Sequence, residues 1–214
     1  MKIIDTPCRY VQPSRTERVQ CVVIHATGET DLDKLLSYYT GNDEHVSPHY
    51  MVQTTGSVRR FHEGARIAYH AGIKPAEARL YQLGYGEWSQ WHWVDGAPKH
   101  LGQEFTGYRT WRQTWYDRGC QSPLDLAGNS HPNAVSIGIE LQSPEFQTKH
   151  IFEDEQYEAL AALLVEVCHC HGVPLDREHL LGHYDVSPMR RSTEHGSYDP
   201  GERFDWLRLW DLVR

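Results

Sequence analysis

Three short apolar stretches, far apart in the chain, each lead into a side chain that is capable of chemistry. They are VQCVVIHAT, AVSIGIELQS and EHLLGHYDV, which carry His25, Glu140 and His183 at or near their ends. Short runs rich in β-branched and aliphatic residues are typical of buried strands. Ligands and catalytic groups collect at strand ends in α/β sheets, so these strands constrain the fold and mark a candidate site together.

Helical patterns alternate with the strands. Residues 30–41 are predicted to form a helix, with Thr30 as its N-cap, Asp31 and Asp33 in its first turn and Gly41 at its end. The clearest helical pattern is FEDEQYEALAALLVEVCHCHGVP, where apolar residues recur at helical spacing and a glycine and a proline follow.

The remaining patterns complete an interleaved order of strands and helices. HYMVQTTGSVRRFH predicts a β-hairpin that turns at Thr55 and Gly56, and RFDWLRLWDLV predicts a short amphipathic helix near the end of the sequence. This order predicts an α/β fold with a mixed central β-sheet flanked by helices. A length of 214 residues favours a single domain over residues 1–214.

An aromatic-rich segment at about 73–132 interrupts the pattern. Its Trp and Tyr residues lie among Gly, Pro and Gln without steady periodicity, and it has too few aliphatic residues for a core of its own. We therefore interpret it as an insertion in the single domain. It could be a platform that stacks on sugar rings, a small cluster clamped over the sheet, or an oligomer contact.

Composition narrows the classes of partner. The formal net charge of −8 argues against a nucleic-acid partner, and no stretch approaches the roughly 20 apolar residues of a membrane span. The first residues show no signal-peptide pattern, and five cysteines without a regular spacing fit a reducing compartment. We therefore expect a cytoplasmic protein; delivery to the cell wall by a non-Sec or phage-type route is the alternative. The sequence leaves the oligomeric state open.

The polar strand ends are compatible with a catalytic zinc site. Two histidines and one carboxylate would leave one position of a tetrahedral zinc ion open to water, and a further glutamate could take a proton from that water. His25 and His183 are the candidate imidazoles, and Asp199 and Asp185 are the candidate carboxylates. The residues alone also allow a plainer reading, in which the histidines cap buried strands and Glu140 is a solvated charge.

Seven segments occur here in the order found in a known enzyme family. They are VVIHAT, VSPHYMVQTTGSV, AYHAG, NAVSIGIEL, DEQYEALAALL, GHYDVSP and DPGERFDW. This series resembles the zinc-dependent N-acetylmuramoyl-L-alanine amidases, a peptidoglycan amidase family that includes phage T7 lysozyme. The similarity is greatest to the branch of cytoplasmic anhydromuropeptide amidases. It covers residues 20–72 and 133–210 and leaves out the aromatic-rich insertion.

The resemblance implies an activity and a site. It implies one zinc ion held by His25, His183 and Asp199, with Glu140 as the catalytic acid and base. The reaction would be hydrolysis of the amide between N-acetylmuramic acid and L-alanine, in peptidoglycan or muropeptide fragments. Asp185 would then hold a turn through backbone hydrogen bonds.

One motif departs from the family. The family usually has a lysine two residues before the aspartate ligand, where it helps to stabilise the oxyanion. Ser197 occupies that position here, within the longer stretch PMRRSTEHGSYDPG. Arg191 matches the lysine if the additional residues form a bulge, and His195 is a second candidate for this catalytic role.

Three further residues fall in segments that match the family. His49, His70 and Asn133 are candidates for substrate binding, and packing is an equally good explanation for both histidines. Cys168 and His171 share a helix face, but two ligands without partners make a poor metal site, so we expect them to pack in the core.

Two other classes of function fit parts of the pattern. A peptidoglycan-recognition module would bind without cutting, and such relatives lose a zinc ligand. A zinc-stabilised interaction domain would instead have a closed zinc site, with Glu140 pointing away from it.

Overall fold

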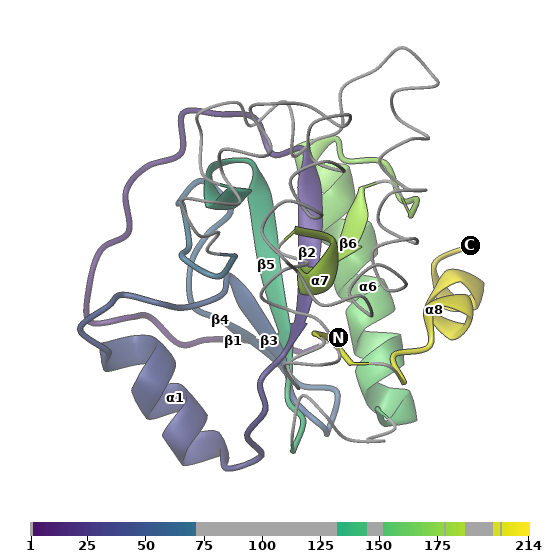
Figure 1. Cartoon of the computed structure of the whole chain (residues 1–214), viewed down its shortest axis with the longest axis horizontal. Helices are drawn as coiled ribbons and strands as arrows, with labels where there is room; N and C mark the ends of the chain where they lie inside the picture. The colour runs from purple at the N-terminus through teal and green to yellow at the C-terminus, as the bar shows by residue number, and fades with distance from the viewer. Residues whose placement is uncertain (1, 72–131, 145–151, 178, 187–198, 202) are drawn as a thin grey trace, which may run out of the picture.

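A six-stranded sheet forms the centre of the computed structural model, which describes residues 2–71, 132–144, 152–177, 179–186, 199–201 and 203–214 (Figure 1). The strand order is β1-β4-β3-β5-β2-β6. The strand bounds are β1 Ile3–Asp5, β2 Cys21–Ala26, β3 Tyr50–Val52, β4 Val58–Arg60, β5 Ser136–Leu141 and β6 Leu180–Gly182. Only the β3–β4 pair of this sheet is antiparallel, so the predicted mixed sheet and the predicted hairpin are confirmed.

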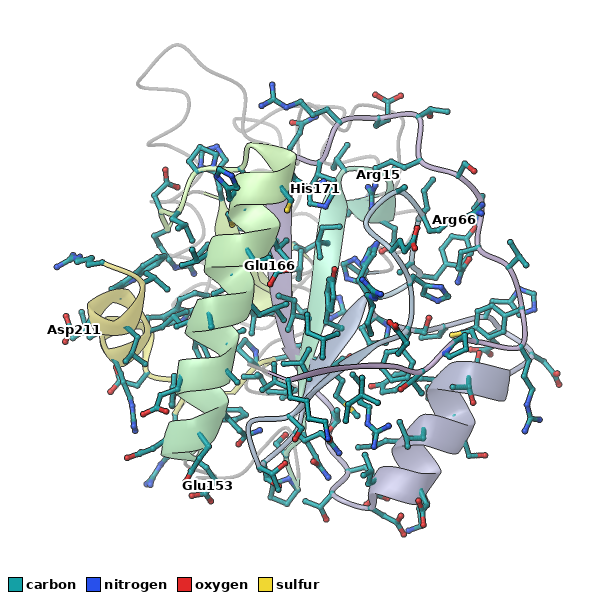
Figure 2. The ribbon with its side chains drawn as sticks, turned by 180° about the vertical axis from the view of Figure 1, so that it is seen from behind. Arg15, Arg66, Glu153, Glu166, His171 and Asp211 are labelled. Atoms are coloured by element: carbon teal, nitrogen blue, oxygen red, sulfur yellow. The ribbon has the colours of Figure 1, made fainter. Side chains whose placement is uncertain are left out.

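The helices lie around this sheet. Their bounds are α1 Leu32–Gly41, α6 Asp154–His171, α7 His183–Val186 and α8 Trp206–Val213, and a 3₁₀ turn, η1, spans Pro132–Ala134. Figure 2 shows α6 lying across one face of the sheet, with α8 beside it. None of the helices in the described part of the chain is long and apolar enough to cross a membrane.

Successive side chains of the central strands β2 and β5 point to opposite faces of the sheet. Val22 and Ile24 of β2 join Ile137 and Ile139 of β5 in the large core against α6, where Leu160 is fully buried. The intervening residues of both strands point to the other face, because successive side chains of a strand alternate. The face opposite α6 therefore receives the polar residues at the strand ends.

Several predicted boundaries are confirmed and three are corrected. α6 ends where predicted, with Gly172 in the left-handed conformation at φ 64°. Asp31, and not Thr30, is the N-cap of α1, because its carboxylate accepts from the backbone N–H groups of Asp33 and Lys34. His183 does not end a strand; it follows β6 directly and opens α7.

The third correction concerns the start of the chain. Ile3–Asp5 form the edge strand β1, which pairs in parallel with β4 and was not predicted. The aromatic-rich insertion, Pro132 apart, lies outside the described residues, so its interpretation stays a prediction.

Arg15 connects the N-terminal segment to the start of β5 (Figure 2). Its guanidinium is partly buried and donates to five backbone carbonyl groups, those of Gly64, Arg66, Asn133, Ala134 and Ser136. Burial lowers the pKa of Arg15 to about 10, which still leaves it charged at neutral pH. A planar fork with five N–H donors suits this set of acceptors better than a lysine ammonium does.

We expect Arg15→Lys to destabilise the fold by roughly 2–4 kcal/mol, because several carbonyl groups would lose a charged donor in a partly buried place. Urea unfolding of the metal-free protein measures this difference. Arg18→Lys is the matched control, since Arg18 is exposed and donates to one carbonyl group, that of Gly172. Equal stability of the two variants would contradict the proposed role of Arg15.

Candidate functional site

The first two candidate residues meet across one strand pair. β2 and β5 are parallel, and their register places His25 directly opposite Glu140. Ile24 and Ile139, the preceding residues, enter the core against α6, so the alternation of the strands sends His25 and Glu140 to the opposite face. The pairing of two apolar strands thus brings together two polar groups that are far apart in the sequence.

His183 and Asp199 complete the cluster. All three of His25, His183 and Asp199 are almost completely buried, with exposed fractions of 1%, 1% and 2%. Both histidines direct Nδ1 at the same oxygen, Oδ2 of Asp199, at 3.1 Å. Their rings are 4.6 Å apart in a T-shaped arrangement.

The carboxylate of Asp199 is held in its charged form. Burial alone would raise its pKa, but the neighbouring imidazoles of His25 and His183 hold the pKa of this carboxyl well below its usual range. The second oxygen, Oδ1, accepts a hydrogen bond of 2.6 Å from the backbone N–H of Ala26. One oxygen is therefore anchored to β2 while the other faces the two imidazoles.

These atoms fit a zinc ion. The ligand atoms of His25, His183 and Asp199 all lie within 4.8 Å of one another. Ligand atoms about 2.0–2.1 Å from a tetrahedral zinc ion are roughly 3.3 Å apart, close to the spacing of both Nδ1 atoms from Oδ2. Two imidazole nitrogens and one carboxylate oxygen are also a donor set of catalytic zinc sites. Within the described ranges, no other His, Cys, Asp and Glu side chains form such a group.

Asp185, the alternative carboxylate, lies outside this group. Its Oδ2 accepts from the backbone N–H of Gly182 at 2.8 Å and from Arg177 at 2.7 Å. Burial raises the pKa of Asp185, and Arg177 opposes that rise. The prediction that Asp185 holds the turn after β6 is confirmed.

A cavity of about 250 Å³ opens beside the cluster. Its lining residues are His25, Ala26, Thr27, Tyr38, Tyr39, Val46, Ser47, Pro48, His70, Glu140 and Asp199. Glu140 therefore shares one cavity with two of the three candidate ligands, His25 and Asp199.

Tyr39 is a site residue that the sequence did not reveal. It lies on α1, lines the cavity, and its hydroxyl hydrogen-bonds the carboxylate of Glu140. Burial, and then the charge of Glu140, raise the pKa of Tyr39 well above its usual value. The hydroxyl therefore stays protonated and donates a hydrogen bond to Glu140. The sequence signals only an apolar helix face at this position, because Leu35 and Tyr39 are four residues apart and both are buried.

The three predicted substrate-binding residues are buried, and of them only His70 lines the cavity. His49 is fully buried: its Nδ1 accepts from the N–H of Gly138, its Nε2 lies 3.1 Å from the carbonyl oxygen of Arg66, and burial lowers its pKa to about 3. Asn133 is buried and accepts from two backbone N–H groups through Oδ1. His70 lines the cavity wall next to His25. Contact of these residues with substrate stays a prediction.

Two further predictions concern the oxyanion-stabilising group and the packing of Cys168. Arg191, His195 and Ser197 lie outside the described residues, so the identity of the oxyanion-stabilising group stays a prediction. Cys168 packs in the core against the sheet, as predicted, and burial raises its thiol pKa to about 12.

Comparison with known proteins gives a family and a fold. The model of a family described as N-acetylmuramoyl-L-alanine amidase matches residues 15–202. A search of the curated proteins gives no match.

Three of the solved structures that share this fold illustrate the comparison. A selenomethionine derivative of AmpD is 20% identical, with a TM-score of 0.60, over 100% of this chain and 94% of that chain. E. coli AmiD, in complex with anhydro-N-acetylmuramic acid-L-Ala-D-γ-Glu-L-Lys, is 22% identical, with a TM-score of 0.57, over 95% of this chain and 61% of AmiD. The peptidoglycan recognition proteins LCa and LCx, bound to tracheal cytotoxin, are 15% identical, with a TM-score of 0.53, over 95% of this chain and 92% of that chain.

The roles of Asp199 and Asp185 can be distinguished by experiment. We expect Asp199→Ala to weaken zinc binding at least 100-fold, because it removes a ligand atom and the anchor on Ala26. We expect Asp185→Ala to leave zinc affinity within a few-fold but to destabilise the fold by roughly 2–3 kcal/mol, since a buried N–H and Arg177 lose their acceptor. Chelator competition measures the affinity and urea unfolding measures the stability. The reverse pattern would make Asp185 the ligand.

Proposed function

Because the chain belongs to the N-acetylmuramoyl-L-alanine amidase family, we propose that His25, His183 and Asp199 hold one zinc ion and that Glu140 transfers the proton during amide hydrolysis. The enzyme hydrolyses the bond between N-acetylmuramic acid and L-alanine. One observation carries the site assignment: three buried ligand atoms converge, and two of their residues, His25 and Asp199, line one cavity together with Glu140 of the adjacent strand.

A bound zinc ion would supply Lewis acidity, which polarises the carbonyl of the scissile amide and lowers the pKa of a coordinated water. The protein itself fixes the geometry of the ligands and supplies the group that transfers the proton. Asp199, fixed through Oδ1 on the backbone of Ala26, keeps one oxygen directed at the two imidazoles. This fixed geometry avoids reorganisation of the ligands during the reaction.

Glu140 is placed to handle the proton. Glu140 lines the same cavity as His25 and Asp199, so its carboxylate can accept a proton from the attacking water and deliver it to the leaving nitrogen of L-alanine. The hydroxyl of Tyr39 donates to this carboxylate and restricts its orientation. We infer that Tyr39 positions Glu140 and does not itself exchange protons with substrate.

The substrate is a peptidoglycan fragment. AmiD, which shares this fold, is seen with an anhydromuramoyl tripeptide, and this supports a soluble muropeptide as the substrate of the present chain. The cavity beside Glu140 would receive the scissile amide. The convergence of His25, His183 and Asp199, with Glu140 lining the adjacent cavity, supports a catalytic enzyme over a recognition module, since such modules lose a zinc ligand.

We expect Glu140→Gln to keep zinc and lose turnover by about 10²–10⁴-fold, the usual contribution of a general acid/base residue. The amide isostere preserves shape but cannot accept the proton. Metal analysis measures the zinc content, and mass spectrometry measures peptide release from anhydromuropeptide. The control is Glu166→Gln, an exposed glutamate on α6, which should change neither quantity. Undiminished activity of Glu140→Gln would refute the role assigned to this residue.

A further inference from the structure

We propose that His70 is a positioning residue of the metal centre, which fixes the tautomer and the ring orientation of His25 through a chain of hydrogen bonds that ends on the backbone. This inference rests on the proposed role of His25 as a zinc ligand. The chain runs from His25 through His70 and Ser136 to the carbonyl group of Pro132, and we call it the His70 relay.

The distances define the His70 relay. Nε2 of His25 lies 3.0 Å from Nδ1 of His70, and Nε2 of His70 lies 3.2 Å from Oγ of Ser136. Oγ of Ser136 lies 2.8 Å from the carbonyl oxygen of Pro132. All three side chains are buried, so the neighbouring protein atoms determine where each proton lies.

The carbonyl group at the far end sets the direction of every bond. The carbonyl oxygen of Pro132 can only accept, so the hydroxyl of Ser136 donates to it and Oγ accepts from Nε2–H of His70. A neutral His70 with its proton on Nε2 has a lone pair on Nδ1. That lone pair accepts the Nε2–H of His25, and a neutral His25 is left with a lone pair on Nδ1.

This tautomer of His25 is the one that binds a metal. Its free lone pair on Nδ1 lies 3.1 Å from Oδ2 of Asp199, a carboxylate oxygen with lone pairs of its own. Two electron-rich atoms at that distance repel one another unless a cation lies between them. Metal-binding histidines commonly donate their second N–H to a neighbouring acceptor, and here the acceptor is a second imidazole.

Neighbouring residues restrict the position of the ring of His70. A Cβ atom at Gly138 would lie 2.3 Å from Cγ of His70, so β5 must have glycine there. The backbone N–H groups of His70 and Ala71 both donate to Oδ1 of Asn133. His49 packs edge-on against His70, with the ring centroids 5.7 Å apart. The ring of His70 therefore has little freedom to turn away from His25.

We expect His70→Phe to weaken zinc binding about 10–100-fold, as loss of such a partner does in other metal sites. The phenyl ring keeps a flat aromatic side chain at this position but offers no acceptor to His25. His70→Asn should recover affinity to within a few-fold of wild type, since its amide oxygen can take the place of Nδ1. Chelator competition measures the zinc affinity. ¹⁵N NMR of the imidazoles should show the Nε2–H of His25 in the wild type and in His70→Asn, and its loss in His70→Phe.

His62→Phe is the matched control. It replaces a similarly buried imidazole outside the His70 relay and should lower stability without changing zinc affinity. If His70→Phe does not fold, Ser136→Ala tests the same chain, because it removes the acceptor of His70 Nε2–H; we expect a loss of about 3–10-fold in zinc affinity.

Wild-type affinity in a folded His70→Phe or Ser136→Ala protein would overturn the His70 relay and leave the proposed function standing. Failure of the wild-type protein to bind zinc would overturn the proposed function itself, and the inference with it.

Discussion

The parallel pairing of β2 with β5 is the constraint on which the rest of the structure depends. Its register places His25 opposite Glu140 and, on the other face, buries Val22 and Ile24 with Ile137 in the core against α6. A slip of one residue in either strand would send an ionisable group into that core and an isoleucine into the cavity. The hydrophobic pattern that stabilises the sheet therefore also fixes the relative position of the candidate ligand and the candidate acid/base residue.

Features with local signals could be predicted from the sequence. α6 has apolar residues at helical spacing and a glycine at its end, and β2 and β5 are short apolar runs. The N-cap of α1 was misplaced by one residue, because Thr30 and Asp31 both suit a cap and only the hydrogen bonds of Asp31 decide between them. β1 is three residues long and exists through its pairing with β4, which no local pattern reveals.

The buried polar residues were the hardest to predict. Arg15 stands among polar residues that resemble a surface segment, yet all five carbonyl groups that it satisfies come from η1, β5 and the segment after β4. Tyr39 follows an apolar pattern, and its hydroxyl meets Glu140 only when α1 packs against the sheet. The candidate ligands His25, His183 and Asp199 are assigned through resemblance to a family, since His25 and Asp199 have no neighbouring partner in the sequence that would mark them as ligands.

The two faces of the sheet have different physical requirements. The face against α6 needs only apolar volume, whereas each buried polar group on the other face needs a partner, since a buried donor or acceptor without one is costly. Several of these partners are backbone groups: the carbonyl of Pro132 for Ser136, the N–H of Gly138 for His49 and the N–H of Ala26 for Asp199. Backbone groups do not titrate or change tautomer, so they fix the proton positions of the side chains that bind them. A fold that satisfies its buried polar groups in this way also prepares two imidazoles and a carboxylate to receive a cation.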